Sequence, residues 1–217
     1  MTATLLYGYY RSSAAYRVRL ALALKGIAYE HRAVDLKAGA QTEPAYLEVN
    51  PQGRVPVLQI DGLKLAQSPA ILDYLEERSP QLALLPADPA DRAFARQAAS
   101  LIACDIHPLN NLSVLRYLKT DLGQDQAAVD RWYAHWITEG FRTLETWLAP
   151  RSGAFAIGDA PGLIEVYLIP QLYNARRFAV PLDAFPTLTA LETACLALPA
   201  FDRARPEVQP DAPKEQP

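Results

Sequence analysis

A strand followed directly by a helix, near the N-terminus, constrains the fold more than any other part of the chain. Leu5–Tyr10 is a β-rich apolar run, and Arg11–Gly26 follows with apolar residues at helical spacing and a glycine at its end. The pattern predicts a strand, a short turn and a helix that stops at Gly26. Ser12 and Ser13 fall at the start of this helix, where unpaired backbone N–H groups attract anions. An ordinary serine N-cap explains the same two residues, so both interpretations are open at this point.

The residues that follow complete a small α/β pattern. A second strand is predicted over Ala28–Val34 and a short helical segment over Gln41–Val49. Asp61-Gly62 between two apolar runs is a strong signal for a β-hairpin. A further helix opens at Gln67-Ser68-Pro69, with the proline at its first position. The resulting order βαβαββα matches a thioredoxin-like domain, which we predict over residues 1–82.

The remainder of the chain is predicted to be helical. A proline-rich linker over Ser79–Asp91 precedes it, and no strand pattern follows. Apolar residues at three-to-four spacing predict a helical-bundle domain over residues 90–217. The periodic segments are Ala93–Leu118, Gln126–Leu148, Leu163–Phe178 and Leu188–Leu198. The fold class is therefore α/β plus all-α, and the proline-rich end, Arg205–Pro217, is expected to be poorly ordered or to lie on the surface.

Composition argues against several classes of protein. The 217 residues are 50% hydrophobic and carry a net charge of −3 with interspersed signs, which speaks against nucleic acid and anionic membranes as partners. No apolar run reaches the ~20 residues of a membrane span, and Met1–Thr4 does not open a secretory leader. Cys104 and Cys195 lie in apolar helical patterns, which predicts buried free thiols in a reducing compartment. We therefore expect a cytoplasmic protein.

Six motifs, met in the family's order, resemble the zeta class of glutathione transferases. Three lie in the first domain: R-S-S-x-x-x-R-V-R from Arg11, N-P-x-G-R-V-P-V from Asn50, and Q-S-x-A-I from Gln67. The others span residues 105–115, 174–178 and 209–213. The resemblance covers nearly the whole chain. It implies the glutathione transferase fold, in which a thioredoxin-like domain precedes a helical bundle, with glutathione as cofactor and a homodimeric assembly.

A glutathione site must favour the thiolate, since a thiol with a pKa of about 8.5 is mostly protonated at neutral pH. Lowering that pKa by about two units requires about 2.7 kcal/mol. A helix N-terminus supplies ~0.3–1 kcal/mol, and a hydrogen bond to a charged group adds ~1.5–3 kcal/mol. A hydroxyl donor is therefore needed beside the helix dipole. The resemblance implies that Ser12 is this donor, with Ser13 close by.

Two further segments of the first domain are implied to bind glutathione. Val55 is forced towards extended geometry by Pro56, and the resemblance implies a cis bond between them, with flanking backbone that pairs with the cysteinyl amide of glutathione. Gln67 and Ser68, at the start of a helix, can bind the γ-glutamyl carboxylate through side chains and N–H groups. A plain helix cap accounts for Ser68 equally well.

Arginine suits a dicarboxylate substrate because its planar fork pairs with carboxylates. Arg11 and Arg177 match family positions that are implied to line the substrate pocket. Arg176 is predicted to be structural, since adjacent helical arginines point in different directions, and Arg17 and Arg19 are predicted to be surface or interdomain residues.

The long first helix of the second domain carries the remaining candidates, and Pro108 implies a kink in it. The resemblance places His107 and Asn111 beside glutathione, and Asp105 near its α-amino group from the same or a neighbouring subunit. A lone helical histidine is more often a structural residue, and no metal-ligand spacing is present in the chain.

The sequence departs from the family at two positions. Ala14 stands where many zeta enzymes have cysteine, so the only thiol for the chemistry is that of the cofactor. Gly162 stands where the family usually has Ser or Thr at the start of a buried helix, which predicts a weakened cap that Glu165 partly compensates.

The activity implied by the resemblance is glutathione-dependent cis–trans isomerisation of maleylacetoacetate to fumarylacetoacetate. Maleylpyruvate isomerisation, or conjugation of small electrophiles such as α-haloacids, uses the same site. A glutathione-binding module without enzymatic activity is the third interpretation. Leu112 adds no positive charge after Asn110-Asn111, which favours maleylacetoacetate over the smaller diacid.

Overall fold

The structure is a computed structural model that describes residues 3–151 and 153–214, and these form two compact units. Unit 1 comprises the chain up to Ala83 together with the chain from Ala197 onward, and unit 2 comprises Leu84–Leu196. The expectations about Met1, Thr2 and the last three residues lie outside the described residues. Residues 197–214 were expected in the helical domain, but they group with the N-terminal unit.

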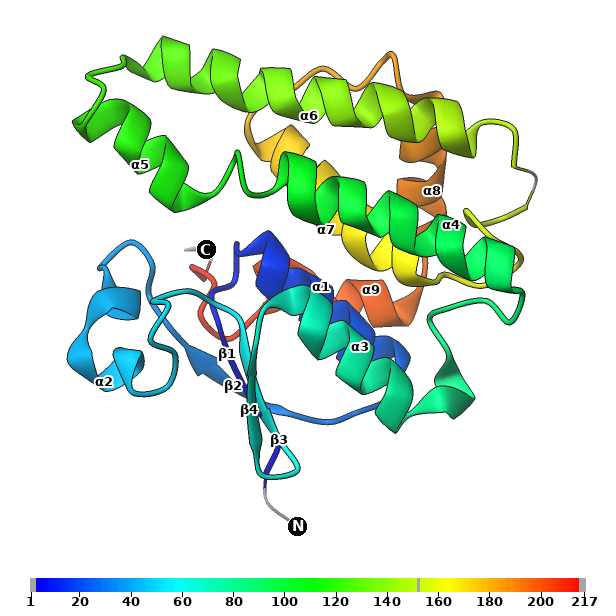
Figure 1. Cartoon of the computed structure of the whole chain (residues 1–217), viewed down its shortest axis with the longest axis horizontal. Coiled ribbons are helices and arrows are strands. Elements are labelled where there is room, and N and C mark those ends of the chain that lie inside the picture. Colours follow the sequence, from blue (N-terminus) through cyan, green and yellow to red (C-terminus); the bar gives the residue numbers. More distant parts are fainter. Residues whose placement is uncertain (1–2, 152, 215–217) are drawn as a thin grey trace. The chain divides into compact units, whose positions relative to one another are not determined.

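Unit 1 is built on a sheet that, within the described residues, has four strands in the order β2-β1-β3-β4 (Figure 1). The strands are β1 (Leu5–Gly8), β2 (Glu30–Ala33), β3 (Val57–Ile60) and β4 (Leu63–Ala66). β1 pairs in parallel with β2, and β3 is antiparallel to both β1 and β4. Asp61 and Gly62, between β3 and β4, have φ of 52° and 81°. Positive φ at both central residues is what a type I′ hairpin requires, so the predicted hairpin is confirmed.

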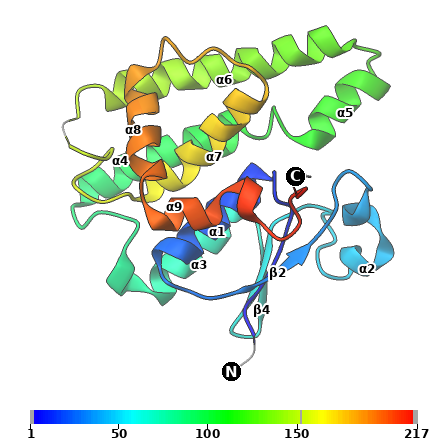
Figure 2. The same cartoon turned by 180° about the vertical axis from the view of Figure 1, so that it is seen from behind.

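The helices of unit 1 follow the predicted order. They are α1 (Ser13–Leu24), α2 (Pro44–Leu47), α3 (Ser68–Arg78) and α9 (Pro199–Ala204), with the short 3₁₀ turns η1 (Ala40–Thr42), η2 (Pro80–Leu82) and η4 (Pro206–Val208). α1 packs against both α3 and α9, and the three lie side by side in both views (Figures 1 and 2). Gly26 has φ of 64° and ends α1 as predicted.

The central helix α1 is buried along most of its length, which overturns one expectation. Arg17 and Arg19 are 1% and 0% exposed, so the surface position, one of the two alternatives predicted for them, is wrong. Arg19 Nε donates to Ala204 O at 2.9 Å and Nη2 donates to Tyr10 O at 3.0 Å. Helix α9 packs against α1 at Arg19, and backbone carbonyls satisfy part of the donor capacity of this arginine.

The described part of the C-terminal segment, residues 205–214, lies mostly on the surface, as one of the two expectations for it stated, and a few buried residues anchor it. Phe201 and Pro206 are buried, and Gln209 is 7% exposed. Gln209 Nε2 donates to the carbonyl oxygens of Arg203 (3.0 Å) and Arg205 (2.8 Å). These contacts fix the segment from Arg203 to Gln209.

All regular elements of unit 2 in its described residues are helices, joined by loops. Its helices are α4 (Pro89–Ser100), the π-helix η3 (Leu101–Ile106), α5 (Leu112–Thr120), α6 (Gln126–Leu148), α7 (Leu163–Arg177) and α8 (Pro186–Leu196). The predicted helix over Ala93–Leu118 is thus divided, because Pro108 has no N–H to continue it and Asn111 caps a new helix. None of the helices in the part that the structure describes combines the length and the hydrophobicity needed to span a bilayer.

The start of α7 shows why glycine stands at position 162. A Cβ built on Gly162 would lie 2.7 Å from Leu84 O, a carbonyl that already accepts from Leu163 N. Glu165 accepts from Gly162 N at 2.8 Å and from Ala156 N at 2.7 Å, so the predicted compensation is confirmed. Burial raises the pKa of Glu165, and these backbone donors oppose the rise.

The two cysteines differ in exposure. Cys195 is buried as predicted, and burial raises the pKa of its thiol. Cys104 is exposed on the π-helix, so the prediction of a buried thiol is wrong at this position. The helical pattern around Cys104 is regular in sequence, but the π-helix changes which side chains face the interior.

Candidate functional site

The register of the sheet brings three predicted segments of unit 1 to one edge. Tyr7 at the end of β1 pairs with Val57 at the start of β3, and Val57 pairs with Ala66 at the end of β4. The turn before α1, the Val55-Pro56 bond and the start of α3 therefore leave the sheet at the same edge. Figure 1 shows these three connections together above the strands.

Ser12 is the N-cap of α1. Its Oγ accepts a hydrogen bond from Ala15 N at 3.2 Å, and its main chain has φ of −68° and ψ of 114°. Ser12 is half-buried, and Ser13, the first helical residue, is 4% exposed. A hydroxyl can donate while it accepts, so the Ser12 O–H is available to a ligand at the helix N-terminus. The structure thus shows the cap, and the predicted anion-binding role would use the same hydroxyl.

Arg11 precedes this cap and lies against aromatic rings. Its guanidinium carbon is 5.1 Å from the centre of the Tyr10 ring, and Nη2 donates to the Tyr9 hydroxyl at 3.4 Å. The two tyrosine rings meet edge to face, with centroids 4.7 Å apart. Stacking of this kind restricts the conformations of a long cationic side chain. Arg11 is therefore an oriented positive charge next to Ser12.

The Val55-Pro56 peptide is cis, as the resemblance implied. The loop that leads to it is fixed at the carbonyl of Arg54, which accepts from Tyr46 Oη at 2.7 Å and from Asn50 Nδ2 at 2.7 Å. Gly53 has φ of 61°, and a Cβ there would lie 3.1 Å from Gln41 O. The asparagine and glycine of the N-P-x-G-R-V-P-V motif therefore shape the loop that presents Pro56.

Gln67 and Ser68 open α3. Gln67 has φ of 68° and ψ of 114°, a conformation that is uncommon for a residue with a side chain and that is found at ligand sites. Ser68 is 4% exposed, and its Oγ accepts from Arg17 Nη1 at 3.3 Å. A strained N-cap, a buried hydroxyl and a buried arginine together form a site suited to a carboxylate at the helix N-terminus.

In unit 2, the predicted residues Asp105, His107 and Asn111 surround one turn. Asp105 is exposed on η3, and His107 is half-buried at its end, where His107 N donates to Ile102 O at 2.9 Å. Asn111 caps α5, with Oδ1 accepting from Ser113 N at 3.1 Å and from Ser113 Oγ at 3.0 Å. A π-helix beside a capped turn is a feature of many functional sites.

Helix α6 holds this turn in place. Trp132 Nε1 donates to Leu109 O at 2.8 Å, and Asn110 Nδ2 donates to Tyr133 O at 3.4 Å. The Tyr133 ring stacks on Phe178 at 3.7 Å, and Phe178 follows Arg177 at the end of α7. Burial raises the pKa of Tyr133 to about 12, and the neighbouring Arg177 opposes the rise. Tyr133 thus contacts two parts of unit 2 that carry predicted site residues.

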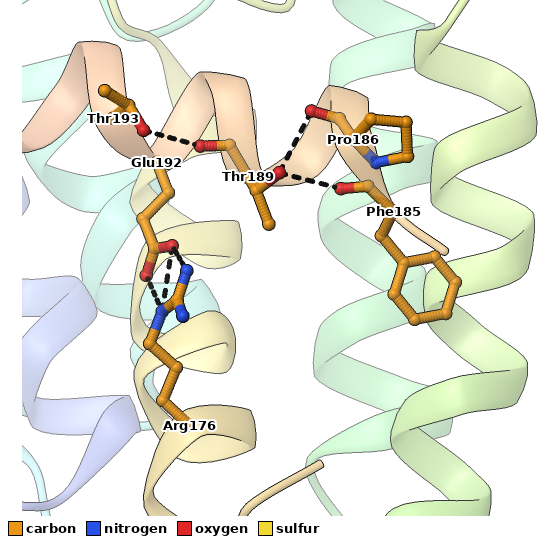
Figure 3. A network of polar contacts seen from close by, with 6 residues as sticks. All are labelled: Arg176, Phe185, Pro186, Thr189, Glu192 and Thr193. Carbon is orange, nitrogen blue, oxygen red and sulfur yellow. Dashed lines mark hydrogen bonds and ion pairs between the residues drawn. The ribbon is translucent and has the colours of Figure 1, made fainter. Parts of the chain in front are cut away.

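Arg177 and Arg176 have different surroundings. Arg177 is exposed, with its guanidinium carbon 4.8 Å from the centre of the Phe178 ring. Arg176 is paired with Glu192, whose carboxylate oxygens both lie 3.0 Å from Arg176 Nε (Figure 3). The structural role predicted for Arg176 therefore agrees with its ion pair.

A hollow of about 510 Å³ lies beside this pair, and its lining includes Arg176, Val180, Asp183 and Thr189. It contains none of the predicted site residues, and its arginine is already neutralised by Glu192 (Figure 3). Within the described residues, no cluster of three or more His, Cys, Asp or Glu side chains could hold a metal ion. The hollow is therefore separate from the predicted site residues.

Sequence reasoning missed the residues that support the site. Asn50 and Gly53 stand inside a quoted motif, where an asparagine followed by proline and a glycine two residues later is a turn signal. Arg17 also stands inside a motif, but its charge suggested the surface. Nothing in the local pattern of α6 distinguishes Tyr133 from other buried aromatic residues.

Comparisons with known proteins agree with this geometry. Residues 2–77 match the family model described as glutathione S-transferase, N-terminal domain. A maleylacetoacetate isomerase of Pseudomonas aeruginosa is 51% identical over 96% of this chain and 98% of its own. The solved holo structure of a maleylpyruvate isomerase, described as a bacterial zeta-class glutathione S-transferase, has a TM-score of 0.94 at 44% identity and covers 96% of this chain and 100% of its own.

A third relative has ligands in its active site. This structure of maleylacetoacetate isomerase from Anaeromyxobacter dehalogenans 2CP-1 contains dicarboxyethyl glutathione and citrate, and it has a TM-score of 0.87 at 45% identity. The match covers 98% of this chain and 95% of the relative. Identity at this level over nearly the whole length establishes common descent, and this chain belongs to the zeta class of the glutathione transferase family.

Proposed function

We propose that this protein is a glutathione-dependent cis–trans isomerase that converts maleylacetoacetate to fumarylacetoacetate. One observation above all supports this function. The segments that carry Ser12, Pro56 and Gln67 connect to the sheet of unit 1 at the same edge, and the Ser12 hydroxyl lies at the N-terminus of α1. That arrangement offers a hydroxyl donor to a thiolate and a helix N-terminus to a carboxylate. The 51% identity to a maleylacetoacetate isomerase supports the choice of substrate.

The chemistry of the donor set fits glutathione. Gln67, Ser68 and the first N–H groups of α3 suit the γ-glutamyl carboxylate, with Arg17 as a buried positive charge behind Ser68. The backbone beside Pro56 suits the cysteinyl amide. We assign supporting contacts to Asp105, His107 and Asn111 on the resemblance. Ala14 brings no thiol to the turn, so the sulfur would come from glutathione alone.

When bound, glutathione would supply a thiolate for reversible addition: the C–S bond forms as the double bond becomes a single bond that can rotate, and its cleavage restores both the thiolate and the double bond, now trans. Ser12 stabilises the ionised sulfur by donating a hydrogen bond from its hydroxyl to it, and the proton stays on the serine oxygen. Arg11 and Arg177 bind the carboxylates and stabilise negative charge that develops on the diacid. The dicarboxyethyl glutathione in the active site of one relative is a thioether of the kind that such an addition produces.

An assay with purified protein, glutathione and maleylacetoacetate tests this function. We expect fumarylacetoacetate to form much faster than with free glutathione alone, since free thiols isomerise the substrate slowly. A rate that does not exceed this background contradicts the proposal. An ultraviolet difference spectrum of bound glutathione separates a catalyst from a binding module, because only a catalyst of this kind should show thiolate absorbance at neutral pH.

Maleylpyruvate is the second candidate substrate, favoured by the holo structure that is 44% identical. Leu112 is exposed directly after Asn111 and offers no positive charge there, which we read as favouring the larger diacid. Competition between the two substrates decides: a higher kcat/KM for maleylpyruvate would reverse the assignment. Conjugation of an α-haloacid with glutathione is the third reaction to measure in the same series.

We also infer a homodimer in the cytoplasm. Family membership supports the dimer, and free Cys104 and Cys195 support a reducing compartment. Light scattering during gel filtration should give about twice the monomer mass of 23.9 kDa, and a mass equal to the monomer contradicts the dimer.

A further inference from the structure

Tyr10 connects β1 to the turn that carries Arg11 and Ser12, and side chains from distant parts of unit 1 hold both of its backbone polar groups. Asp211 Oδ2 accepts from Tyr10 N at 2.9 Å, across 201 residues of sequence. Arg19 Nη2 donates to Tyr10 O at 3.0 Å. The peptide groups on either side of Tyr10 are therefore oriented by one carboxylate and one guanidinium.

Asp211 is itself fixed. Its Oδ1 lies 3.0 Å from His31 Nε2 on β2, and the two side chains are only 12% and 6% exposed. Ala212 N donates to Gln209 O at 3.0 Å, which closes a turn around Asp211. The carboxylate thus has a defined position between the second strand and the Tyr10 backbone.

The same C-terminal segment also holds Arg19. Arg19 is fully buried, its Nε donates to Ala204 O at 2.9 Å, and its guanidinium carbon lies 5.1 Å from the centre of the Tyr16 ring. Residues 199–212, which we call the C-terminal strap, therefore act on Tyr10 at two points. One contact is direct, through Asp211, and the other passes through Arg19.

Ser12 follows Tyr10 by two residues and depends on the same backbone. Ser12 N donates to Tyr9 O at 2.9 Å, so a backbone hydrogen bond closes the turn from Tyr9 to Ser12. A misplacement of about 1 Å at a reacting group can reduce the rate by about 100-fold. A residue that fixes the Tyr10 peptide therefore controls the direction of the Ser12 hydroxyl.

Resting on the proposed function, we propose that Asp211 is a positioning residue for the reaction: it fixes the Tyr10 backbone and so directs the Ser12 hydroxyl towards the glutathione sulfur. It touches neither substrate nor cofactor in this role. The C-terminal strap thereby becomes part of the thiol-activating apparatus of unit 1.

Three substitutions in the full chain test this role. Asp211→Ala removes the acceptor for Tyr10 N, Asp211→Asn keeps an oxygen of the same reach, and Asp202→Ala is the control, because Asp202 lies on the same strap but forms only an exposed pair with Arg205. The readouts are the pKa of bound glutathione, from thiolate absorbance against pH, together with kcat, KM for glutathione and the thermal unfolding midpoint.

For Asp211→Ala we expect the thiol pKa to rise by about one unit or more, with kcat at neutral pH about tenfold lower and KM for glutathione within about threefold of the parent. Asp211→Asn should restore both values to within about threefold, and Asp202→Ala should match the parent. In a Ser12→Ala background, Asp211→Ala should leave the thiol pKa unchanged, since no hydroxyl remains to be directed.

An unchanged thiol pKa and kcat in folded Asp211→Ala overturns the inference, and so does an Asp211→Asn variant as impaired as the alanine variant. If Asp211→Ala does not fold, Asp211→Ser takes its place with the same expected and overturning results, because its shorter side chain cannot reach both Tyr10 and His31. The thiol pKa is measured with glutathione alone. This measurement does not depend on isomerase activity. If the parent protein proves not to be an isomerase, the proposed function fails, but the effect of Asp211 on the thiol pKa can still be tested.

Discussion

The Ser12 hydroxyl combines two roles that act on different quantities. As an acceptor from Ala15 N, it stabilises the start of α1. As the proposed donor to a thiolate, it lowers the pKa of glutathione. Because the first role concerns unfolding and the second concerns ionisation, substitutions can separate them.

Ser12→Ala and Ser12→Gly should show this separation. Both lack the hydroxyl, so kcat at neutral pH should fall by about 10- to 100-fold in each, from the loss of ~1.5–3 kcal/mol of thiolate stabilisation. Alanine at an N-cap costs about 0.5–2 kcal/mol, but glycine costs only a few tenths. Urea unfolding should therefore show that the glycine variant is more stable than the alanine variant. If both variants have the same kcat as the parent, the proposed catalytic role of Ser12 is contradicted.

Arg177 and Arg176 provide a matched pair for the substrate site. Arg177→Gln should lower kcat/KM for maleylacetoacetate by about tenfold or more, since a charge-assisted hydrogen bond contributes ~1.5–3 kcal/mol. Arg176→Gln should leave kcat/KM within about threefold, because the Arg176 guanidinium is occupied by Glu192. Steady-state kinetics at fixed glutathione measures both, and a larger loss in Arg176→Gln would reverse the two assignments.

Sequence patterns predicted the residues of the turns well and the buried charges poorly. Ser12 and the start of α3 near Gln67 follow from short motifs, whose geometry is local, and the cis bond at Pro56 was implied by the family resemblance. Arg17 and Arg19 were assigned to the surface or to a domain contact because arginine is rarely enclosed. Arg19 bonds to a carbonyl on α9, which lies far away in the sequence, and Arg17 bonds to a hydroxyl on α3. No periodicity reveals either partner.

At the scale of elements, the π-helix η3 depends on a glycine in a neighbouring helix. A Cβ built on Gly140 of α6 would lie 2.2 Å from Ile106 Cδ1 and 2.5 Å from Ile106 Cγ1. Ile106 is 1% exposed, so its side chain has little room to move away. Gly140 therefore permits the close packing of η3, which carries Asp105, against α6.

Gly140→Ala should destabilise the protein, although alanine favours helix by about 1 kcal/mol. Overpacking in a filled core costs about 1–3 kcal/mol, so a net loss of about 1–2 kcal/mol is expected in urea unfolding. In an Ile106→Ala background the clash is absent, and Gly140→Ala should instead stabilise. The same sign in both backgrounds would show that contact with Ile106 does not determine the effect.

His31 should make the stability of the β2 region depend on pH. Burial lowers the pKa of His31 from 6.5, Asp211 opposes this and Arg19 reinforces it. The unfolded state therefore binds the proton more tightly than the folded state. The contribution of His31 is fully present above pH 6.5 and is lost as pH falls from 6.5 through the folded pKa.

His31→Gln should flatten that dependence. Urea midpoints measured between about pH 7.5 and pH 5 should decline less steeply in the variant than in the parent, since glutamine has no proton to bind. The two proteins differ only at residue 31, so the difference between the two curves reports His31 together with its contact to Asp211. Identical slopes would mean that the folded and unfolded pKa values of His31 are equal.

At the scale of the whole molecule, the chain returns to its first unit after completing its second. Periodicity predicted two domains in sequence order, because each helix or strand pattern extends over only a few turns. The return of 197–214 depends on contacts such as the one between Arg19 and Ala204, 185 residues apart, and no local pattern encodes them.

Unit 1 should consequently need both of its segments to fold. A fragment of residues 1–83 lacks α9, so it exposes the surface of α1 that Phe201 covers and leaves Arg19 Nε without Ala204 O. Small domains are stable by only about 5–15 kcal/mol, and truncation of a buried phenylalanine alone costs about 3–5 kcal/mol. The fragment should therefore show no cooperative thermal transition by circular dichroism.

Joining residues 1–83 to residues 197–217 through a flexible glycine-serine linker should restore that transition, since closing such a loop adds only about 0.6 kcal/mol for each doubling of its length. Phe201→Ala in the linked protein is the matched control, and it should weaken or abolish the transition. A cooperative transition in residues 1–83 alone, at the midpoint of the linked protein, would mean that the strap adds nothing to the folding of unit 1. Tyr10 is held by Asp211 of this strap and by Arg19 of α1, which itself donates to Ala204 of the strap. A folded unit 1 and a directed Ser12 then have the same structural requirement.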